Sequence, residues 1–260
     1  MLNAAAYGFR IAGGPDGWLT VDGGDDWPLL TLAPDPTVSL EDQARVDWGR
    51  MHADVCAELP PDEVVHPLLG RMLPLLAETR GIDALHGGLL LGADGGWAVI
   101  GAREAGKSSL LAQCHREGAH VLSDDIVVLE GTRCLAGPRC IDLREEPART
   151  LGPGVPVRAG TKRRIKLPPA PAEAELAGFV WLAWGEETTL GPLRPSDRLG
   201  RLVAHRAEQL WPRNPSLVLD LATLPAFELR RERGLQSLEA SAELLMERLG
   251  TPMEPRPAGL

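Results

Sequence analysis

The chain has 260 residues, of which 44% are hydrophobic and 24% charged, an ordinary globular composition that allows one large domain or a medium domain with a small partner. Its 27 Lys and Arg against 36 Asp and Glu give a net charge of −9, which disfavours nucleic acid and anionic membranes as partners. No apolar run approaches the ~18 residues that span a bilayer, no secretory signal is visible, and the four cysteines contain no C-x-x-C pair. We therefore expect a cytoplasmic protein with free thiols and with no membrane or nucleic-acid partner.

Residues 1–80 are predicted to form a small N-terminal α+β extension. Short apolar runs at residues 7–11, 18–21 and 29–32 are typical of strands, and Gly- and Asp-rich turns separate them. Apolar residues recur at helical spacing over residues 63–79, which predicts a helix that packs against the part of the chain that follows.

A glycine-rich motif occupies residues 101–108, Gly-Ala-Arg-Glu-Ala-Gly-Lys-Ser. It fits G-x-x-x-x-G-K-[ST], the phosphate-binding loop (P-loop), whose glycines let backbone N–H groups point at phosphate oxygens. An apolar strand at residues 97–100 enters the motif, and a predicted helix at residues 107–117, with Leu110 and Leu111 inward, leaves it. A chance match in a Gly-rich turn is the alternative, but a strand, a loop and a helix are the context that the motif requires.

The motif predicts a nucleoside triphosphate site. Lys107 supplies a positive charge for the β- and γ-phosphates, and the Ser108 hydroxyl is placed to bind Mg²⁺. The predicted nucleotide-binding residues are Gly101, Ala102, Arg103, Glu104, Ala105, Gly106, Lys107, Ser108 and Ser109.

Two adjacent acids are the second chemical signal. Residues 85–91 and 97–100 are predicted to form a hairpin with its turn at residues 94–96, and a further apolar strand at residues 119–129 is interrupted by Asp124 and Asp125. Neighbouring carboxylates inside a strand are unfavourable because one of them would face the core. Either a cation and a proton transfer use these two acids, or the pair caps a turn between two strands.

Three motifs together resemble a known family. His86-Gly87, then the G-x-x-x-x-G-K-S loop, then Ser-Asp-Asp at residues 123–125 are similar, in order and spacing, to the catalytic core of HPr kinase/phosphorylase and its serine-kinase relatives. The resemblance covers residues 81–130 and extends more weakly to residue 167. It implies, for residues 81–250, an α/β P-loop nucleotide-binding fold of the HPr kinase / phosphoenolpyruvate carboxykinase type, with ATP and Mg²⁺ as cofactors.

The resemblance also implies roles for individual residues. Asp124 matches the aspartate that takes the proton of the acceptor hydroxyl, and His86 matches the active-site histidine that interacts with it. Lys107 matches the phosphate-binding lysine, while Ser108 and Asp125 lie on the metal side. These roles agree with what in-line phosphoryl transfer requires, namely phosphate positioning, charge neutralisation and a base near the acceptor.

The chain departs from the bifunctional enzymes in two ways. Their later Glu-Arg-Gly type segment has no clean match, the nearest stretch being residues 139–146, so the resemblance does not extend to phosphorylase activity. The N-terminal stretch is short and unlike their regulatory domain. This short form is similar to kinases that accompany ribosomally made peptides such as lasso peptides, which implies a protein or peptide substrate with an acceptor serine. By the same analogy a homo-oligomer is expected.

Two other function classes compete with a kinase. A non-catalytic ATP-binding regulatory or scaffold module would need the same loop. A GTPase switch or a transport ATPase is not expected, since the chain contains neither Asn-Lys-x-Asp nor Leu-Ser-Gly-Gly-Gln.

The last third is predicted to contain strands at residues 178–184 and 227–230 and helices at residues 198–209 and 235–249. A disordered tail is expected at residues 251–260. The basic stretches at residues 162–164 and 194–206 either form solvated faces or bind phosphates or an acidic acceptor. Arg139 and Arg144 are candidates for a transition-state arginine. The remaining metal-type residues, Cys114, His115 and His120, lack zinc spacing and are read as non-functional.

Overall fold

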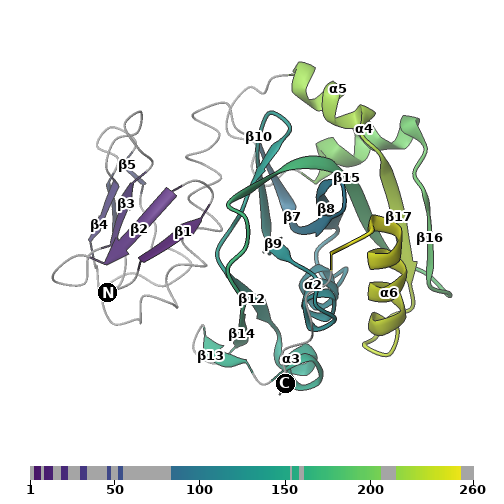
Figure 1. Ribbon diagram of the computed structural model, residues 1–260, viewed down its shortest axis with the longest axis horizontal. Helices are drawn as coiled ribbons and strands as arrows, with labels where there is room; N and C mark the ends of the chain where they lie inside the picture. Colours follow the sequence, from purple (N-terminus) through teal and green to yellow (C-terminus); the bar gives the residue numbers. More distant parts are fainter. Residues whose placement is uncertain are drawn as a thin grey trace.

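A computed structural model describes residues 83–152, 154–157, 161–205 and 215–252, together with the backbone of six short strands before residue 83. These six strands form one sheet in the order β1-β2-β3-β4-β6-β5. It lies to one side of the larger sheet in Figure 1. Its members are β1 (Asn3–Ala6), β2 (Phe9–Gly13), β3 (Leu19–Asp22), β4 (Leu30–Ala33), β5 (Val46–Asp47) and β6 (His52–Asp54).

The main body is a mixed α/β structure built on an eight-stranded sheet. The strands run in the order β11-β10-β7-β8-β15-β17-β16, and β9 also pairs with β7. They are β7 (Asp83–Gly92), β8 (Gly95–Gly101), β9 (Val121–Ser123), β10 (Ile126–Glu130), β11 (Arg133–Leu135), β15 (Glu173–Trp184), β16 (Thr189–Pro192) and β17 (Ala226–Arg231). The central strands β8, β15 and β17 are parallel, whereas β7 is antiparallel to β8.

This arrangement brings the carboxyl ends of three strands to one edge of the sheet. Gly101 ends β8, Trp184 ends β15 and Arg231 ends β17. In open α/β sheets ligands bind at this edge, because the loops that follow parallel strands meet there.

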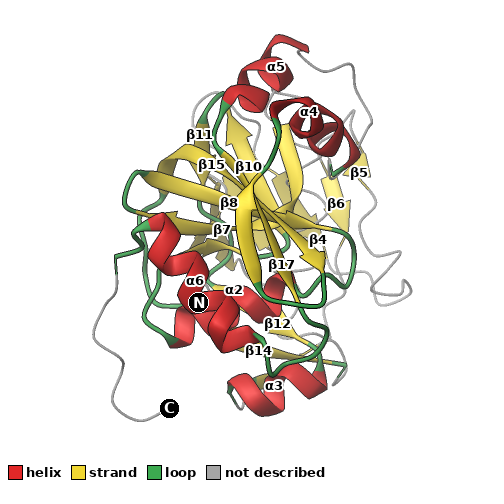
Figure 2. Cartoon of the chain, turned by 90° about the vertical axis from the view of Figure 1, so that its right-hand side faces the viewer, coloured by secondary structure: helices red, strands yellow, loops and turns green. Residues whose placement is uncertain are grey.

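Helices cover both faces of the large sheet. Figure 2 shows α2 (Lys107–Arg116) and α6 (Leu238–Leu249) together on one side, and α4 (Pro195–Ala204) and α5 (Pro215–Thr223) packed against one another elsewhere on the sheet. Successive side chains along a strand point to opposite faces of the sheet, so each strand contributes to two hydrophobic cores. In β8, Val99 belongs to the core under α2 and α6, and Ile100 belongs to the core under α4 and α5. A small sheet of β12 (Cys140–Leu143), β14 (Lys162–Lys166) and β13 (Val155–Val157), with α3 (Glu145–Leu151), completes the body.

Most predicted elements are found, with shifted ends. The strands predicted at residues 7–11, 18–21 and 29–32 correspond to β2, β3 and β4, and the hairpin is β7–β8, although its turn is Ala93-Asp94 rather than residues 94–96. The helix predicted at residues 198–209 begins earlier, as α4, because Pro195 is favoured in the first turn of a helix.

Some predictions lie outside the described residues: the helix at residues 63–79 and the tail beyond residue 252. The sequence reading missed the helices α3 and α5 and the short strands β1, β5, β6, β11, β12, β13, β14 and β16. No helix in the described part of the chain is long and apolar enough to cross a membrane.

Candidate phosphate-transfer site

The motif at residues 101–108, called here the glycine-rich loop, connects β8 to α2 at the carboxyl edge of the sheet. Glu104 and Gly106 both have positive φ, 67° and 83°, so the backbone is left-handed at two positions just before the helix starts at Lys107. The first turn of a helix leaves backbone N–H groups without helical partners, and its dipole favours an anion there. The loop therefore has the backbone form of an anion-binding site.

The Lys107 side chain is bonded to the start of the glycine-rich loop. Its Nζ donates to the carbonyl oxygens of Gly101 at 2.8 Å and Ala102 at 3.1 Å, and the residue is only 8% exposed. Burial lowers the pKa of Lys107, whereas the nearby Asp125 and Asp124 act to raise it. A compact cation is thus held against the loop by weak carbonyl partners that phosphate oxygens can replace.

Asp124 and Asp125 lie where the predicted long strand is broken into β9 and β10. Both short strands pair with β7, and the Gly87 amide donates to the Asp125 carbonyl oxygen at 3.0 Å. Asp125 has φ 75°, a left-handed conformation that Asp tolerates better than most residues. The two acids therefore occupy a bend between strands, as the turn alternative predicted, and the same bend brings them to the glycine-rich loop.

The two carboxylates have different surroundings. Asp124 is 3% exposed and accepts a hydrogen bond of 2.9 Å from the Ser108 hydroxyl. Burial and the adjacent charge of Asp125 raise the pKa of Asp124 to about 7, although the Ser108 hydrogen bond lowers it. The side chain of Asp125, in contrast, is 43% exposed. One carboxylate is thus packed against the loop serine, and the other is open to an incoming molecule.

His86 lies beside Asp125. Its Nδ1 is 3.7 Å from the Asp125 Oδ1, which is longer than a hydrogen bond. Burial and the charge of Lys107 lower the pKa of His86, whereas the charge of Asp125 acts to raise it, and the net effect favours the neutral imidazole. The family resemblance implies that His86 interacts with Asp124, whereas the structure places His86 next to Asp125.

A residue that the sequence reading did not single out adjoins His86. The His86 backbone amide donates to the His205 carbonyl oxygen at 3.0 Å, which anchors the end of α4 at the site. No motif marks His205, and only the crossing of α4 over the sheet brings it there.

The two candidate arginines behave differently. Arg139 donates to the backbone oxygens of Val121, Leu122 and Pro168, so its guanidinium is occupied in holding strands together. Arg144 instead forms an exposed ion pair of 2.6 Å with Glu104 of the glycine-rich loop. Of the two, only Arg144 lies at the loop.

Arg231, a further residue that the sequence reading did not single out, contacts the glycine-rich loop and lies over Trp184, which the sequence reading assigned to core packing. Arg231 is 2% exposed, and its guanidinium stacks on the Trp184 ring at 4.3 Å from the centroid. Strand alternation could have found it, since Phe227, Leu229 and Arg231 share a face, but the sequence reading ended this strand at residue 230.

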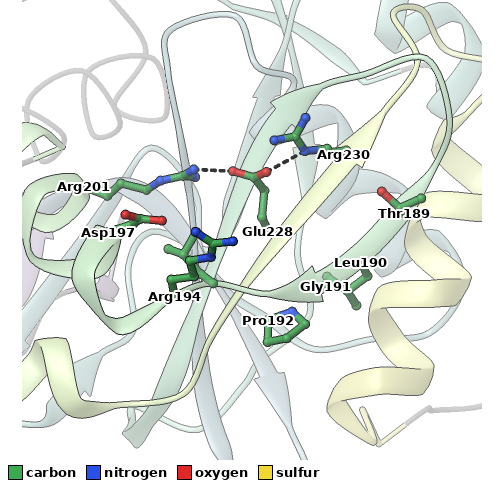
Figure 3. Close-up of a pocket in the computed structure, with 10 residues that line it drawn as sticks. Thr189, Leu190, Gly191, Pro192, Arg194, Asp197, Arg201, Glu228 and Arg230 are labelled. Atoms are coloured by element: carbon green, nitrogen blue, oxygen red, sulfur yellow. Dashed lines mark hydrogen bonds and ion pairs between the residues drawn. The ribbon is translucent and has the colours of Figure 1, made fainter.

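The two basic stretches, residues 162–164 and 194–206, differ in the contacts that their arginines make. In the first, Arg164 forms a buried two-bond pair with Asp142 and so is structural. In the second, Arg194 and Arg201 line a polar surface pocket of about 340 Å³ between α4, β16 and β17, where Glu228 accepts from Arg201 and from Arg230 at 2.6 Å (Figure 3). The pocket lies on the sheet face opposite Arg231, because Arg230 and Arg231 point to opposite sides.

The described residues contain no cluster of three or more His, Cys, Asp and Glu side chains that could hold a metal. Cys114, Cys134 and Cys140 are buried, and burial raises the pKa of Cys114 to about 12. These thiols are therefore packing residues and not nucleophiles. A magnesium site in this part of the chain would have to combine Ser108, an acid of the bend and the phosphates themselves.

Comparison with known proteins gives distant similarity to solved structures alone. Neither a protein-family model nor a curated protein sequence matches the chain. Among solved structures, the chain is similar to the HPr(Ser) kinase/phosphatase from Coxiella burnetii, with 14% sequence identity over 64% of this chain and 95% of that chain, at a TM-score of 0.33. A similarity this distant does not establish the family, so a functional assignment has to rest on the site itself.

Proposed function

We propose that the chain binds Mg·ATP at the glycine-rich loop and transfers the γ-phosphoryl group to a serine hydroxyl of a protein or peptide. The observation that carries the proposal is the pair of unlike carboxylates at the loop: Asp124 is buried against Ser108, and Asp125 is open beside His86. The acceptor class comes from the family resemblance of the three motifs.

The residues present fit a magnesium ion. Mg²⁺ prefers oxygen ligands, and a carboxylate and a hydroxyl meet here at 2.9 Å. Burial and the adjacent Asp125 raise the pKa of Asp124 to about 7, so a bound cation would favour its ionised form. When bound, Mg²⁺ supplies neutralisation of the charge that develops on the phosphates.

We propose roles for the two acids that are the opposite of those that the resemblance implies. A base for a protein hydroxyl has to be reached from solvent, and Asp125 is 43% exposed while Asp124 is 3% exposed. We therefore assign the base to Asp125 and the metal side to Asp124 with Ser108. His86 Nδ1 lies 3.7 Å from the Asp125 Oδ1, so the imidazole flanks the proposed base without a hydrogen bond to it.

The proposed transfer follows from these positions. The acceptor oxygen attacks the γ-phosphorus, the bond to the ADP oxygen breaks, and the hydroxyl proton passes to Asp125. Lys107 leaves the loop carbonyls for phosphate oxygens, and the backbone N–H groups of the glycine-rich loop hold the β-phosphate.

The test uses γ-labelled ATP, Mg²⁺ and a size-fractionated extract of the source cells. Wild type is compared with Asp125→Asn and with Asp94→Asn, a matched change at the exposed hairpin turn of β7–β8. Label entering one protein or peptide band with wild type and Asp94→Asn, but not with Asp125→Asn, supports the proposal. Unchanged labelling by Asp125→Asn rejects it as the base. Mg·ATP binding with no labelled product favours the non-catalytic module.

A further inference from the structure

A buried cation lies directly under the glycine-rich loop without a carboxylate partner in the described part of the chain. Arg231 is 2% exposed, and its Nη1 donates to the Gly234 carbonyl oxygen at 3.0 Å and to the Ser237 hydroxyl at 3.4 Å. Its Nη2 donates to the carbonyl oxygen of Ala105, within the glycine-rich loop, at 3.4 Å, and its Nε has no partner among the described residues. These carbonyl and hydroxyl groups satisfy some of the N–H donors but leave the positive charge uncompensated.

The Arg231 guanidinium lies between the glycine-rich loop and the Trp184 ring. It stacks on Trp184 at 4.3 Å from the ring centroid. A Cβ added to Gly106 would collide with its Nη2, so the second glycine of the motif and Arg231 occupy adjoining space. Since Gly106 has φ 83°, any side chain there would also strain the backbone.

An unpaired buried charge is unfavourable, and an apolar side chain of similar volume would fill the space at lower free energy. Burial lowers the pKa of Arg231 to about 10, yet it remains charged at pH 7. Arg231 ends β17 at the same sheet edge as the end of β8, and its contact with the Ala105 carbonyl oxygen places the charge at the loop that would receive an anion. A role in packing alone does not require this charge.

We propose that Arg231 is a positioning residue for polyphosphate: its guanidinium supports the glycine-rich loop at Gly106 and adds a fixed positive charge behind the phosphates. The inference rests on the proposed function only in requiring that the loop bind phosphate; it does not require phosphoryl transfer. The ligand class is the polyphosphate chain of a nucleoside triphosphate.

The experiment measures binding of inorganic tripolyphosphate by calorimetry to wild type, Arg231→Gln, Arg231→Lys and Arg233→Gln. Arg233 is the matched control, because it lies over the same Trp184 ring at 5.4 Å from the centroid but is exposed. We expect Arg231→Gln to bind about ten- to a hundredfold more weakly, Arg231→Lys to recover most of that loss, and Arg233→Gln to match wild type. Recovery by lysine separates a charge effect from a packing effect.

The inference is overturned if folded Arg231→Gln binds tripolyphosphate as tightly as wild type, if Arg233→Gln loses as much affinity, or if Arg231→Lys is as weak as Arg231→Gln. Should Arg231→Gln not fold, Arg231→Met replaces it in the same comparison. Wild type that binds no tripolyphosphate overturns both this inference and the proposed function. Wild type that binds it but phosphorylates nothing overturns only the kinase.

Discussion

Replacing Asp124 by asparagine is expected to stabilise the metal-free protein at alkaline pH. Burial and the neighbouring Asp125 raise the pKa of Asp124 from its ordinary 3.8 to about 7. Because the pKa is higher in the folded protein, the native state keeps a proton that the unfolded chain releases, so stability falls as the pH rises from about 4 to about 7 and then levels off. At ~1.4 kcal/mol for each pH unit of that window, the ionised carboxylate destabilises the fold by up to ~4 kcal/mol.

Asparagine keeps the shape of the side chain, and its amide oxygen can still accept the Ser108 hydrogen bond. The substitution therefore removes the titration and little else. Urea denaturation in EDTA, from about pH 5 to about pH 8.5, measures the free energy of unfolding of wild type, Asp124→Asn and the exposed control Asp94→Asn. We expect Asp124→Asn to overtake wild type as the pH rises, with the difference levelling off above about pH 7.

The reasoning fails if the curves of wild type and Asp124→Asn run parallel, because Asp124 would then titrate alike in the folded and unfolded states. A second measurement tests whether Asp124 contributes to binding of Mg·ATP. Mg·ATP should raise the stability of wild type and act much less on Asp124→Asn, since only the wild-type carboxylate gains a cation. Equal stabilisation of both proteins would remove Asp124 from the metal side.

Three further substitutions probe other parts of the same structure. Lys107→Ala should lower phosphoryl transfer by about a hundredfold or more and weaken ATP binding, measured by labelled transfer and calorimetry; activity near wild type would contradict this. Gly106→Ala should destabilise the protein by ~1–3 kcal/mol or more, because φ 83° and the contact with Arg231 both oppose a Cβ, and a melting temperature equal to wild type would show that the loop relaxes freely. Asp142→Ala should cost ~3–5 kcal/mol in urea denaturation by leaving the buried Arg164 without its carboxylate, with Asp142→Leu/Arg164→Met recovering much of the loss; no recovery would locate the defect elsewhere.

Local patterns account for the features that the sequence predicted well. The glycine-rich loop and α2 follow from the motif and from helical periodicity, because both depend on residues close together in the chain. The hairpin of β7 and β8 was found for the same reason, since Gly95 and Gly96 follow its two-residue turn.

The orientation of the two acids could not be predicted in this way. β9 is buried at every position, so its sequence has no apolar–polar alternation to show which neighbour faces inward. The bend at Asp124-Asp125 then decides which carboxylate meets Ser108, and that bend depends on pairing with β7. The family resemblance supplied candidate residues but not their partners in this chain.

Arg231, which the sequence reading did not single out, shows that the order of strands in the sheet helps to form the site. Arg231 reaches Ala105 across a sequence separation of 126 residues because the parallel strands β8, β15 and β17 end together at one edge. Trp184 is brought to the loop by the same register. Damage to the pairing of β15 with β17 should therefore weaken phosphate binding while every residue of the glycine-rich motif remains intact. The motif specifies the backbone that faces the phosphates, and the charge beneath it depends on the order of strands in the sheet.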